Sequence, residues 1–495
     1  MKARSHDDAG GFITLEVMLA IALIGTMFVG ATAMERGNSY WILSARTDHE
    51  ALPAAAETLE STSAAADRDF FHLASSFAPD DPSCTAPGAC DGVRRVMTDI
   101  STCAKTVDIR TERHLPGYPT RNTAISSVLT DPVEAVALGG DCALGSPSGN
   151  WSAPAPTASA DIGNGSPAGL DVYQGIAYIV TDKPPYLRIV TPQGPVAFAN
   201  AFIGEGPFNA VDVGRNVISG RIYAYVAAVS PQLQIIDVTD PHNPQLTGSA
   251  PLAGITLKGA QAQAWRIFVY GGTAYVTARY MISANPEIHA FDVNDPENPQ
   301  ELGRGYKAST SIYGIVVHAQ SVRGTQKRLA YLATTSPTGE LKVLDVTDPT
   351  DIVPVASCDL PGNYRGNVLT LLGTTLYLGR DTVTNGGEEL FAFDASDPSA
   401  PSFCQPTGKT TIGTDVYSRH VEAVRASGPY LFVATTNTTD AHGQLQIRNA
   451  DPSSNLALLG TYALPGLAEN ALDFENNTLY AASTASPHVQ ALTAE

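Results

Sequence analysis

Leu233-Gln-Ile-Ile-Asp237-Val-Thr-Asp240-Pro241 is one of five copies of a phrase in this chain of 495 residues. The other copies begin at Ile288, Leu341, Leu390 and Leu445, at intervals of 49 to 55 residues, and the last copy is degenerate. A recurring interval of this size indicates a repeat architecture. Each copy is an alternating apolar run that ends in an Asp-x-x-Asp-Pro corner, and another short apolar run lies upstream of it. The phrase therefore predicts a strand, a turn and a strand, iterated along the chain.

The number of repeated units can be read from the upstream runs, in each of which a small or apolar residue stands next to Tyr or Phe. Seven occur: Ala177-Tyr178, Tyr223 to Val226, Ala274-Tyr275, Ala330-Tyr331, Leu376-Tyr377, Leu431-Phe432 and Leu479-Tyr480. Four-stranded units of about 40 to 50 residues are typical of propeller blades. The repeats resemble the LVIVD-repeat family of propellers. We therefore expect an all-β propeller of seven blades over residues 168–495.

The seventh unit contains no fourth strand before Glu495. Because an open ring would leave an unpaired strand edge, we expect a segment near residues 150–166 to supply that strand. The same region, residues 145–167, is rich in Pro, Ser, Ala and Gly and is expected to be the linker into the propeller.

The repeated corner has two interpretations. Carboxylates at alternating spacing suit a calcium ion, but no Gly-x-Glu completion follows, and Asp and Pro are preferred residues of turns. We expect these residues to shape corners, and we predict no metal site and no cofactor.

The N-terminal segment differs in character from the repeats. An apolar stretch runs from Phe12 to Met34 with Glu16 as its only charge, which is long enough to span a bilayer. Gly10-Gly11-Phe12-Ile-Thr-Leu-Glu16 resembles the type IV prepilin motif. The resemblance implies a leader over residues 1–11, cleavage after Gly11 by the prepilin peptidase, and methylation of Phe12. It also implies that Glu16 pairs with the amino terminus of a neighbouring pilin or pseudopilin subunit.

Glu16 has an alternative role near the interface of a plain membrane anchor, where a carboxylate is inexpensive. The pilin resemblance implies an α+β N-terminal module: a long membrane or filament helix over residues 12–75, bent or broken at Pro53, and a small head over residues 76–144. A strand is expected at Lys105–Arg110.

Composition limits the possible partners. The net charge is −19, so we expect no nucleic-acid binding through a phosphate backbone. Six cysteines in an exported chain predict disulfides. Cys358 and Cys404 fall in the expected fourth strands of consecutive blades, whereas Cys84 with Cys90 and Cys103 with Cys142 would staple the head. Two or more free thiols are the alternative.

No catalytic motif is present: there is no Gly-x-Ser-x-Gly, no His-Glu-x-x-His and no Cys-x-x-Cys. Gly408-Lys-Thr410 lacks the upstream glycine of a phosphate loop, and His318 and His420 are expected to be ordinary polar residues near first strands. We therefore predict that the protein is not an enzyme.

The expected ligand site is the mouth of the ring, where loops meet the innermost strands. Alignment of the first strands places five residues at one equivalent position and five more nearby: Asn209, Trp265, Asn367, Glu422 and Asn470, then Tyr313, Tyr364, Arg365, Tyr417 and Arg419. Their amide, aromatic and guanidinium groups suit a glycan or a peptide. The alternative is that they only cap the channel and bond to strand ends.

Together these features predict a minor, tip-located type IV pilin-like protein whose propeller serves adhesion or recognition. The expected location is the cytoplasmic membrane before assembly and then a filament at the cell surface. The propeller would bind an unknown surface glycan, a peptide or an envelope protein. A type II secretion pseudopilin that binds secreted substrate is the first alternative, and a surface-tethered propeller enzyme is the second.

Overall fold

In this computed structural model, the residues described are 51–63, 65, 73, 75–80, 91–101, 103–113, 121–138, 147–191, 206–253, 263–279, 285–382, 387–413, 419–436, 444–466 and 471–495. The chain divides into two compact units. The first comprises residues 1–64, 74–96 and 107–127, and the second comprises residues 65–73, 97–106 and 128–495.

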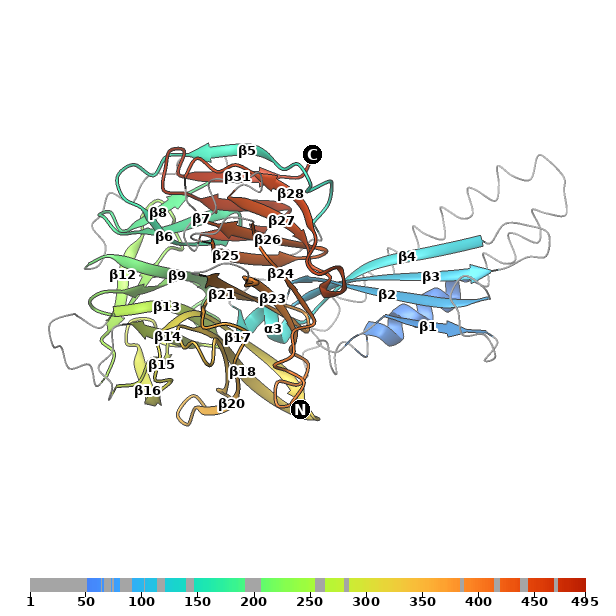
Figure 1. Ribbon diagram of the computed structural model, residues 1–495, viewed down its shortest axis with the longest axis horizontal. Helices are drawn as coiled ribbons and strands as arrows, with labels where there is room; N and C mark the ends of the chain where they lie inside the picture. The colour runs from blue at the N-terminus through green and yellow to red at the C-terminus, as the bar shows by residue number, and fades with distance from the viewer. Residues whose placement is uncertain are drawn as a thin grey trace, which may run out of the picture. The chain divides into compact units, whose positions relative to one another are not determined.

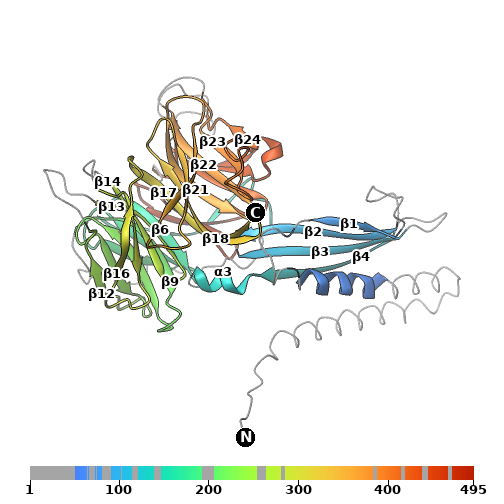
Figure 2. The same cartoon turned by 90° about the horizontal axis from the view of Figure 1, so that it is seen from below.

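The N-terminal region folds around a four-stranded antiparallel meander. Residues 51–63 are helical, and Ala51, Ala55 and Leu59 form a buried stripe at helical spacing. The strands are β1 (Ser76–Pro79), β2 (Gly92–Ser101), β3 (Ala104–Arg113) and β4 (Arg121–Thr130), in the order β1-β2-β3-β4 (Figure 2). β3 confirms the strand expected at Lys105–Arg110.

The expectation of an α+β pilin module is wrong for the part of the chain that the structure describes, because this part is nearly all β. Within the described ranges, no helix is both long and apolar enough to cross a membrane. The physical reason is that the sequence of residues 76–130 alternates as strands do. The expectation gave more weight to the N-terminal motif than to this alternation. Most of the expected helix over residues 12–75, with Gly11, Phe12 and Glu16, lies outside the described residues.

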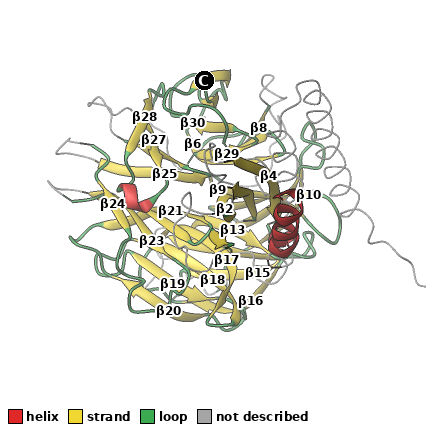
Figure 3. Ribbon diagram, turned by 90° about the vertical axis from the view of Figure 1, so that its right-hand side faces the viewer, coloured by secondary structure: helices red, strands yellow, loops and turns green. Residues whose placement is uncertain are grey.

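The second unit contains seven blades arranged around a centre (Figures 1 and 3). Blades 1 to 3 are β6 (Pro167–Tyr173), β7 (Ile176–Thr181) and β8 (Leu187–Val190); β9 (Phe208–Arg215), β10 (Ile222–Ala228), β11 (Leu233–Asp237) and β12 (Gln245–Ala250); and β13 (Gln263–Tyr270), β14 (Thr273–Arg279), β15 (Ile288–Asp292) and β16 (Gln300–Tyr306). Blades 4 and 5 are β17 (Ile312–Val322), β18 (Thr325–Thr334), β19 (Leu341–Asp345) and β20 (Val353–Cys358); and β21 (Arg365–Leu372), β22 (Thr375–Thr382), β23 (Leu390–Asp394) and β24 (Gly408–Thr410). Blades 6 and 7 are β25 (Arg419–Ser427), β26 (Tyr430–Thr435), β27 (Leu445–Asn449) and β28 (Leu458–Tyr462); and β29 (Leu472–Glu475), β30 (Thr478–Ala482), β31 (Val489–Thr493) and β5 (Ala155–Ala160).

The ring closes as the sequence predicts. β5 pairs antiparallel with β31, so that blade 7 has the order β29-β30-β31-β5. The segment expected as a linker also contributes Trp151, which is fully buried between blades 6 and 7. Residues 151–160 are thus part of the last blade and its packing.

Apolar packing lies between the blades. Seven clusters of buried side chains occur in the described residues, and each joins one blade to the next, including blade 7 to blade 1. The clusters draw on the alternating apolar positions of the first, second and third strands, which explains why the repeated phrases are apolar at every second residue. The innermost strands take part in these clusters and also line a cavity at the centre of the ring.

Each Asp-x-x-Asp-Pro corner is held by its own carboxylates. Asp237 Oδ1 accepts from the Thr239 amide at 2.9 Å, and Asp240 Oδ1 accepts from the His242 amide at 3.0 Å. The same pair of bonds recurs in the blade 4 corner, where Asp345 accepts from the Thr347 amide and Asp348 accepts from the Thr350 amide. No group of three or more metal-ligating side chains occurs within the described ranges. The bonds are those of turn residues, as expected from the sequence.

The corners also pack against glycines of the preceding blade. A Cβ added to Gly248 of β12 would lie 2.1 Å from the Pro296 carbonyl oxygen in the corner of blade 3. We expect Gly248→Ala to lower the free energy of unfolding by about 1–3 kcal/mol, because a backbone cannot yield as a side chain can. Urea unfolding checks this, with the exposed Ser249→Ala as the control, and equal stability of the two variants would contradict it.

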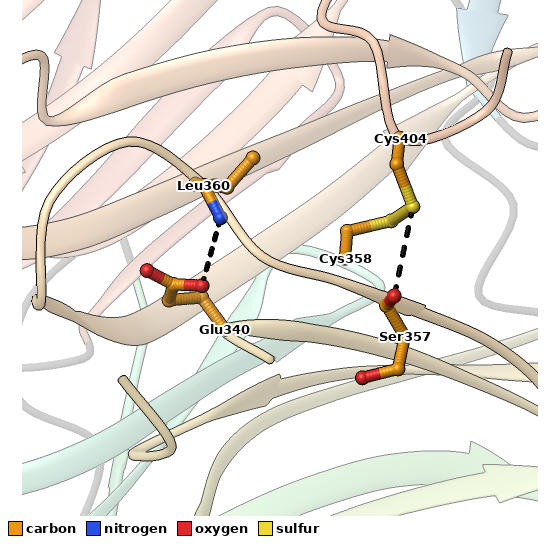
Figure 4. Close-up of a disulfide and its surroundings, with 5 residues drawn as sticks. All are labelled: Glu340, Ser357, Cys358, Leu360 and Cys404. Atoms are coloured by element: carbon orange, nitrogen blue, oxygen red, sulfur yellow. Dashed lines mark hydrogen bonds between the residues drawn. A yellow bond between two sulfur atoms is a disulfide. The ribbon is translucent and has the colours of Figure 1, made fainter. Parts of the chain in front are cut away.

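A disulfide joins blades 4 and 5 (Figure 4). Cys358 ends β20, and Cys404 lies in the turn before β24, with their Cα atoms 5.1 Å apart. This bridge confirms the predicted pairing, although Cys404 precedes the strand. Cys103 is also disulfide-bonded, and Cys84, Cys90 and Cys142 lie outside the described residues.

Candidate functional site

One equivalent position recurs in all seven innermost strands, directly opposite an aromatic residue of the second strand. The innermost residues are Asp171, Asp212, Phe268, Val316, Thr370, Arg425 and Asp473, opposite Tyr178, Tyr225, Tyr275, Tyr331, Tyr377, Phe432 and Tyr480. The aromatic partners are the residues that counted the blades in the sequence. Three carboxylates and one guanidinium therefore lie at the same level of the ring.

The three carboxylates bind the blades together. Asp171 accepts from the Val213 amide at 2.6 Å, Asp212 accepts from the Val269 amide at 2.7 Å, and Asp473 accepts from the Val172 amide at 2.7 Å. Each bond crosses to the next blade, so these side chains have a structural role.

Arg425 partly neutralises this acidic level. Its Nε atom lies 2.8 Å from Asp473 Oδ1, and its Nη2 atom lies 3.8 Å from Asp171 Oδ1. No comparable ion pair involves Asp212 within the described ranges. Burial raises the pKa of Asp212 to about 7, and Asp473 adds to the rise, whereas the Val269 amide and Arg425 oppose it.

The pKa of Asp212 predicts a pH-dependent stability. The folded protein keeps this proton up to near pH 7, whereas an unfolded Asp loses it near about pH 3.9. The contribution of Asp212 to the free energy of unfolding therefore falls as the pH rises between these values. We expect Asp212→Asn, whose amide oxygen can still accept from Val269, to be more stable than the parent at high pH and equal to it at low pH. Thermal melts across about pH 4 to 8 check this, and a difference that does not change with pH would contradict it.

The innermost strands surround a cavity of about 250 Å³. At the end where these strands finish, the cavity is lined by Ile100, Ser101 and Leu138. The Ser427 hydroxyl donates to the Ile100 carbonyl at 3.1 Å, and the Gly271 amide donates to the Ala137 carbonyl at 2.6 Å. Residues 100–101 and the short helix α3 (Pro132–Ala137) therefore cover this end.

Glu134 of α3 anchors this cover. Its carboxylate accepts from the Tyr270 hydroxyl and lies 2.6 Å from His318 Nδ1. Glu134 and His318 are both buried. His318 is thus a packed polar residue, as expected. His420 lies 3.9 Å from Asp381.

The mouth of the cavity lies where the innermost strands begin. The first strands of blades 1 to 6 each contain a β-bulge there, and the extra residues form what we call the bulge ring: Ala168, Asn209, Trp265, Tyr313, Asn367 and Glu422. Bulges redirect side chains and are frequent beside functional sites. Four of the aligned candidates occupy this ring, and Tyr313 is their equivalent in blade 4.

The two asparagines of the bulge ring are already bonded. Asn209 Nδ2 donates to the Ala264 carbonyl at 2.7 Å, and Asn367 Nδ2 donates to the Val421 carbonyl at 2.7 Å. Both acceptors directly precede the bulge of the next blade. These two side chains therefore bond to strand ends, as in the alternative in which the residues at the mouth only cap the channel.

Trp265 and Tyr313 come together with two arginines that the sequence interpretation missed. Their ring centroids lie 5.6 Å apart, and the guanidinium carbons of Arg279 and Arg266 lie 4.2 and 5.0 Å from the Trp265 ring. Burial lowers the pKa of Arg266 to about 10, and the Glu422 charge opposes this shift. Arg266 directly follows the bulge, and Arg279 lies across the hairpin, so pairing of the two strands is the signal that would have found them.

The remaining candidates are placed as follows. Tyr364 packs against the Arg380 guanidinium at 4.9 Å, and the amide of the exposed Arg365 donates to Asp381 at 3.0 Å. Arg419 begins β25, where its side chain is not described, and Tyr417 and Asn470 lie outside the described residues.

A Ser, His and Asp cluster beside the ring closure lacks the geometry of a nucleophilic triad. Asp161 accepts from the Ser486 hydroxyl at 2.6 Å and lies 2.7 Å from His488 Nδ1. A triad requires the serine hydroxyl to bond to the histidine, whereas here the carboxylate takes both partners. The cluster clamps the segment after β5 to the loop before β31.

The repeat phrase, the seven blades and the corner bonds agree with one comparison. Residues 215–250 match the LVIVD repeat. The LVIVD match spans β10, β11 and β12, including the phrase that begins at Leu233. No curated protein matches the chain.

Two solved structures resemble the chain at low sequence identity. The β-propeller domain of Cps50 (Swd1) from Myceliophteria thermophila is 12% identical with a TM-score of 0.46, over 69% of this chain and 100% of that chain. YCF48 bound to D1 peptide is 10% identical with a TM-score of 0.41, over 70% and 100%. These similarities carry no argument about function, and the propeller assignment rests on the seven blades and the LVIVD match.

Proposed function

We propose that the propeller is a recognition module that binds its ligand at the mouth of the central cavity. The supporting observation is the mouth itself: a cavity of about 250 Å³ whose lining includes Arg266 and Tyr313, covered at its far end by Ile100 and Leu138. Ligand sites are concave and carry a few polar groups that set orientation. A site of this kind suits the binding of a ligand.

The finer proposal is that the chain is a minor, tip-located type IV pilin-like protein that displays this module for adhesion. Its support is the sequence Gly11-Phe12 with Glu16, which lies outside the described residues. A type II secretion pseudopilin uses the same leader and remains the alternative. Mass spectrometry of the protein from sheared surface filaments tests the display, since methylated Phe12 is expected there. An unprocessed Met1 found only in membranes would overturn it.

Recognition is tested on the full-length protein in detergent, immobilised and screened against glycan and peptide arrays. We expect saturable binding that competes with free ligand and is weakened by Tyr313→Ala. The matched control is Tyr186→Ala in blade 1, whose ring packs against Phe208 at 5.4 Å. Binding that the two variants weaken equally would overturn the assignment of the mouth.

A further inference from the structure

We infer that the mouth recognises a carboxylate of an acidic peptide, held by Arg266, Arg279 and the Trp265 indole N–H. This inference rests on the proposed recognition function and names the ligand class for the same site. It follows from which groups at the mouth are already engaged and which still lack a partner.

The flat aromatic surfaces at the mouth are engaged. The Arg279 guanidinium lies 4.2 Å from the Trp265 ring centroid and 5.5 Å from that of Tyr313. Stacked guanidinium groups are retained by cation–π attraction. A sugar ring would have to displace Arg279 before it could stack on Trp265.

Hydrogen-bond donors remain to be satisfied at the same place. Trp265 Nε1 and Arg266 Nη2 are buried and have no hydrogen-bond partner among the described residues. A buried donor without an acceptor is costly, and such groups in a native fold call for an explanation. Arg266 lines the cavity, so the orphaned donor belongs to a side chain that borders the space a ligand would enter.

Two positive charges lie close together at the mouth. Two guanidinium groups share the Trp265 ring, and the Arg279 charge contributes to the lowered pKa of Arg266. Glu422 is the acid that opposes this shift. The pair of arginines is a local exception in a chain of net charge −19. Guanidinium groups bind carboxylates through directed, charge-assisted hydrogen bonds.

A peptide fits this chemistry better than an acidic glycan. The side-chain amides and the aromatic face that would suit a sugar are engaged, because Asn209 and Asn367 donate to neighbouring backbone carbonyls and Arg279 lies over the Trp265 ring. Deeper in the cavity, Asp171 and Asp473 share the single positive charge of Arg425, so this level disfavours a second anion. A single Asp or Glu side chain of a peptide needs neither a free amide nor a free aromatic face, and it brings only one negative charge near the mouth.

The test measures fluorescence anisotropy of labelled peptides with the full-length protein in detergent. The probes are an Asp/Glu-rich peptide, its Asn/Gln counterpart and a Lys-rich peptide, with a polyuronate and a neutral oligosaccharide as competitors. We expect the acidic peptide to bind, its affinity to fall as salt rises, and Arg279→Gln to weaken it about tenfold or more. Trp265→Phe keeps the ring and removes the N–H, and it should weaken binding about fivefold.

Glu422→Gln should have the opposite effect on affinity. It removes the acid that competes for Arg266, so the acidic peptide should bind more tightly. Arg221→Gln is the control: Arg221 is exposed and pairs with Asp237 outside the mouth, and we expect unchanged affinity. A thermal stability equal to that of the parent protein shows that Arg279→Gln and Glu422→Gln both fold.

The outcomes separate this inference from the proposed function. Binding of a neutral ligand that Arg279→Gln leaves unchanged would overturn the carboxylate assignment but keep the recognition module. Binding of the polyuronate in place of the peptide would overturn the peptide assignment. Binding of none of the probes, together with empty glycan and peptide arrays, would overturn both.

Discussion

Replacement of Trp151 by alanine is expected to lower the free energy of unfolding by about 3–5 kcal/mol, because a large buried aromatic leaves a cavity that its neighbours fill only in part. Trp151 is fully buried, and its ring packs edge-on against Phe432 at 4.9 Å and Phe474 at 5.6 Å. It also precedes β5, so its loss should weaken the strand that closes the ring. Urea unfolding of the full-length protein measures the change.

Two further variants sharpen this prediction. Trp151→Phe keeps an aromatic ring and removes an indole N–H that has no hydrogen-bond partner among the described residues, so it should cost less than half as much. Leu459→Ala, at a 41% exposed position, should change stability by no more than about 0.5 kcal/mol. If Trp151→Ala were as stable as the Leu459 control, the packing of residues 151–160 against the last blade would be refuted.

Loss of Arg380 is expected to be comparably severe, at about 3–5 kcal/mol for Arg380→Ala. Arg380 is fully buried and donates to the Glu388 carbonyl at 2.7 Å and the Pro361 carbonyl at 2.8 Å. Its Nη1 atom lies 3.6 Å from Glu340 Oε1. The variant leaves two carbonyls unpaired and a buried carboxylate without its countercharge.

Glu340 gives this second prediction a pH signature. Burial raises the pKa of Glu340, and the Leu360 amide and the Arg380 charge oppose the rise (Figure 4). Without Arg380 the ionised carboxylate is more costly, so the stability lost in Arg380→Ala should be larger at high pH than at low pH. Thermal melts at several pH values measure this.

An exposed ion pair supplies the control for Arg380. Lys409 lies 2.7 Å from Glu388, and its side chain is 49% exposed. Lys409→Ala should cost no more than about 1 kcal/mol, because water screens such a pair. A loss in Arg380→Ala no greater than in Lys409→Ala would show that the buried arginine is not needed for stability.

The propeller was predictable because its signals are local and repeated. Alternating apolar residues around Tyr178 or Tyr275 mark strands wherever they occur, and seven repetitions count the blades. The closure by β5 followed from a missing fourth strand in blade 7. The pairing of Cys358 with Cys404 followed from their equivalent places in consecutive blades.

The chemistry of the mouth was less accessible to sequence reasoning. Asn209 and Trp265 were correctly aligned with one another, but their partners depend on which side chains meet across strands and blades. The stacking of Arg279 on Trp265 joins residues of β14 and β13, and the bond from Asn209 to Ala264 joins two blades. The α+β expectation failed for a different reason, since one N-terminal motif was extended to strands that carry their own pattern.

The pairing of β5 with β31 determines when the propeller can become a closed body. The Thr157 hydroxyl donates to the Ala491 carbonyl 334 positions away, and bringing such distant segments together is entropically slow and comes late. A chain that is synthesised or exported from its N-terminus therefore passes through an incomplete propeller with unpaired edge strands. Such edges can pair with strands of other chains. The edges of the ring are therefore satisfied only after β31 has emerged and paired with β5.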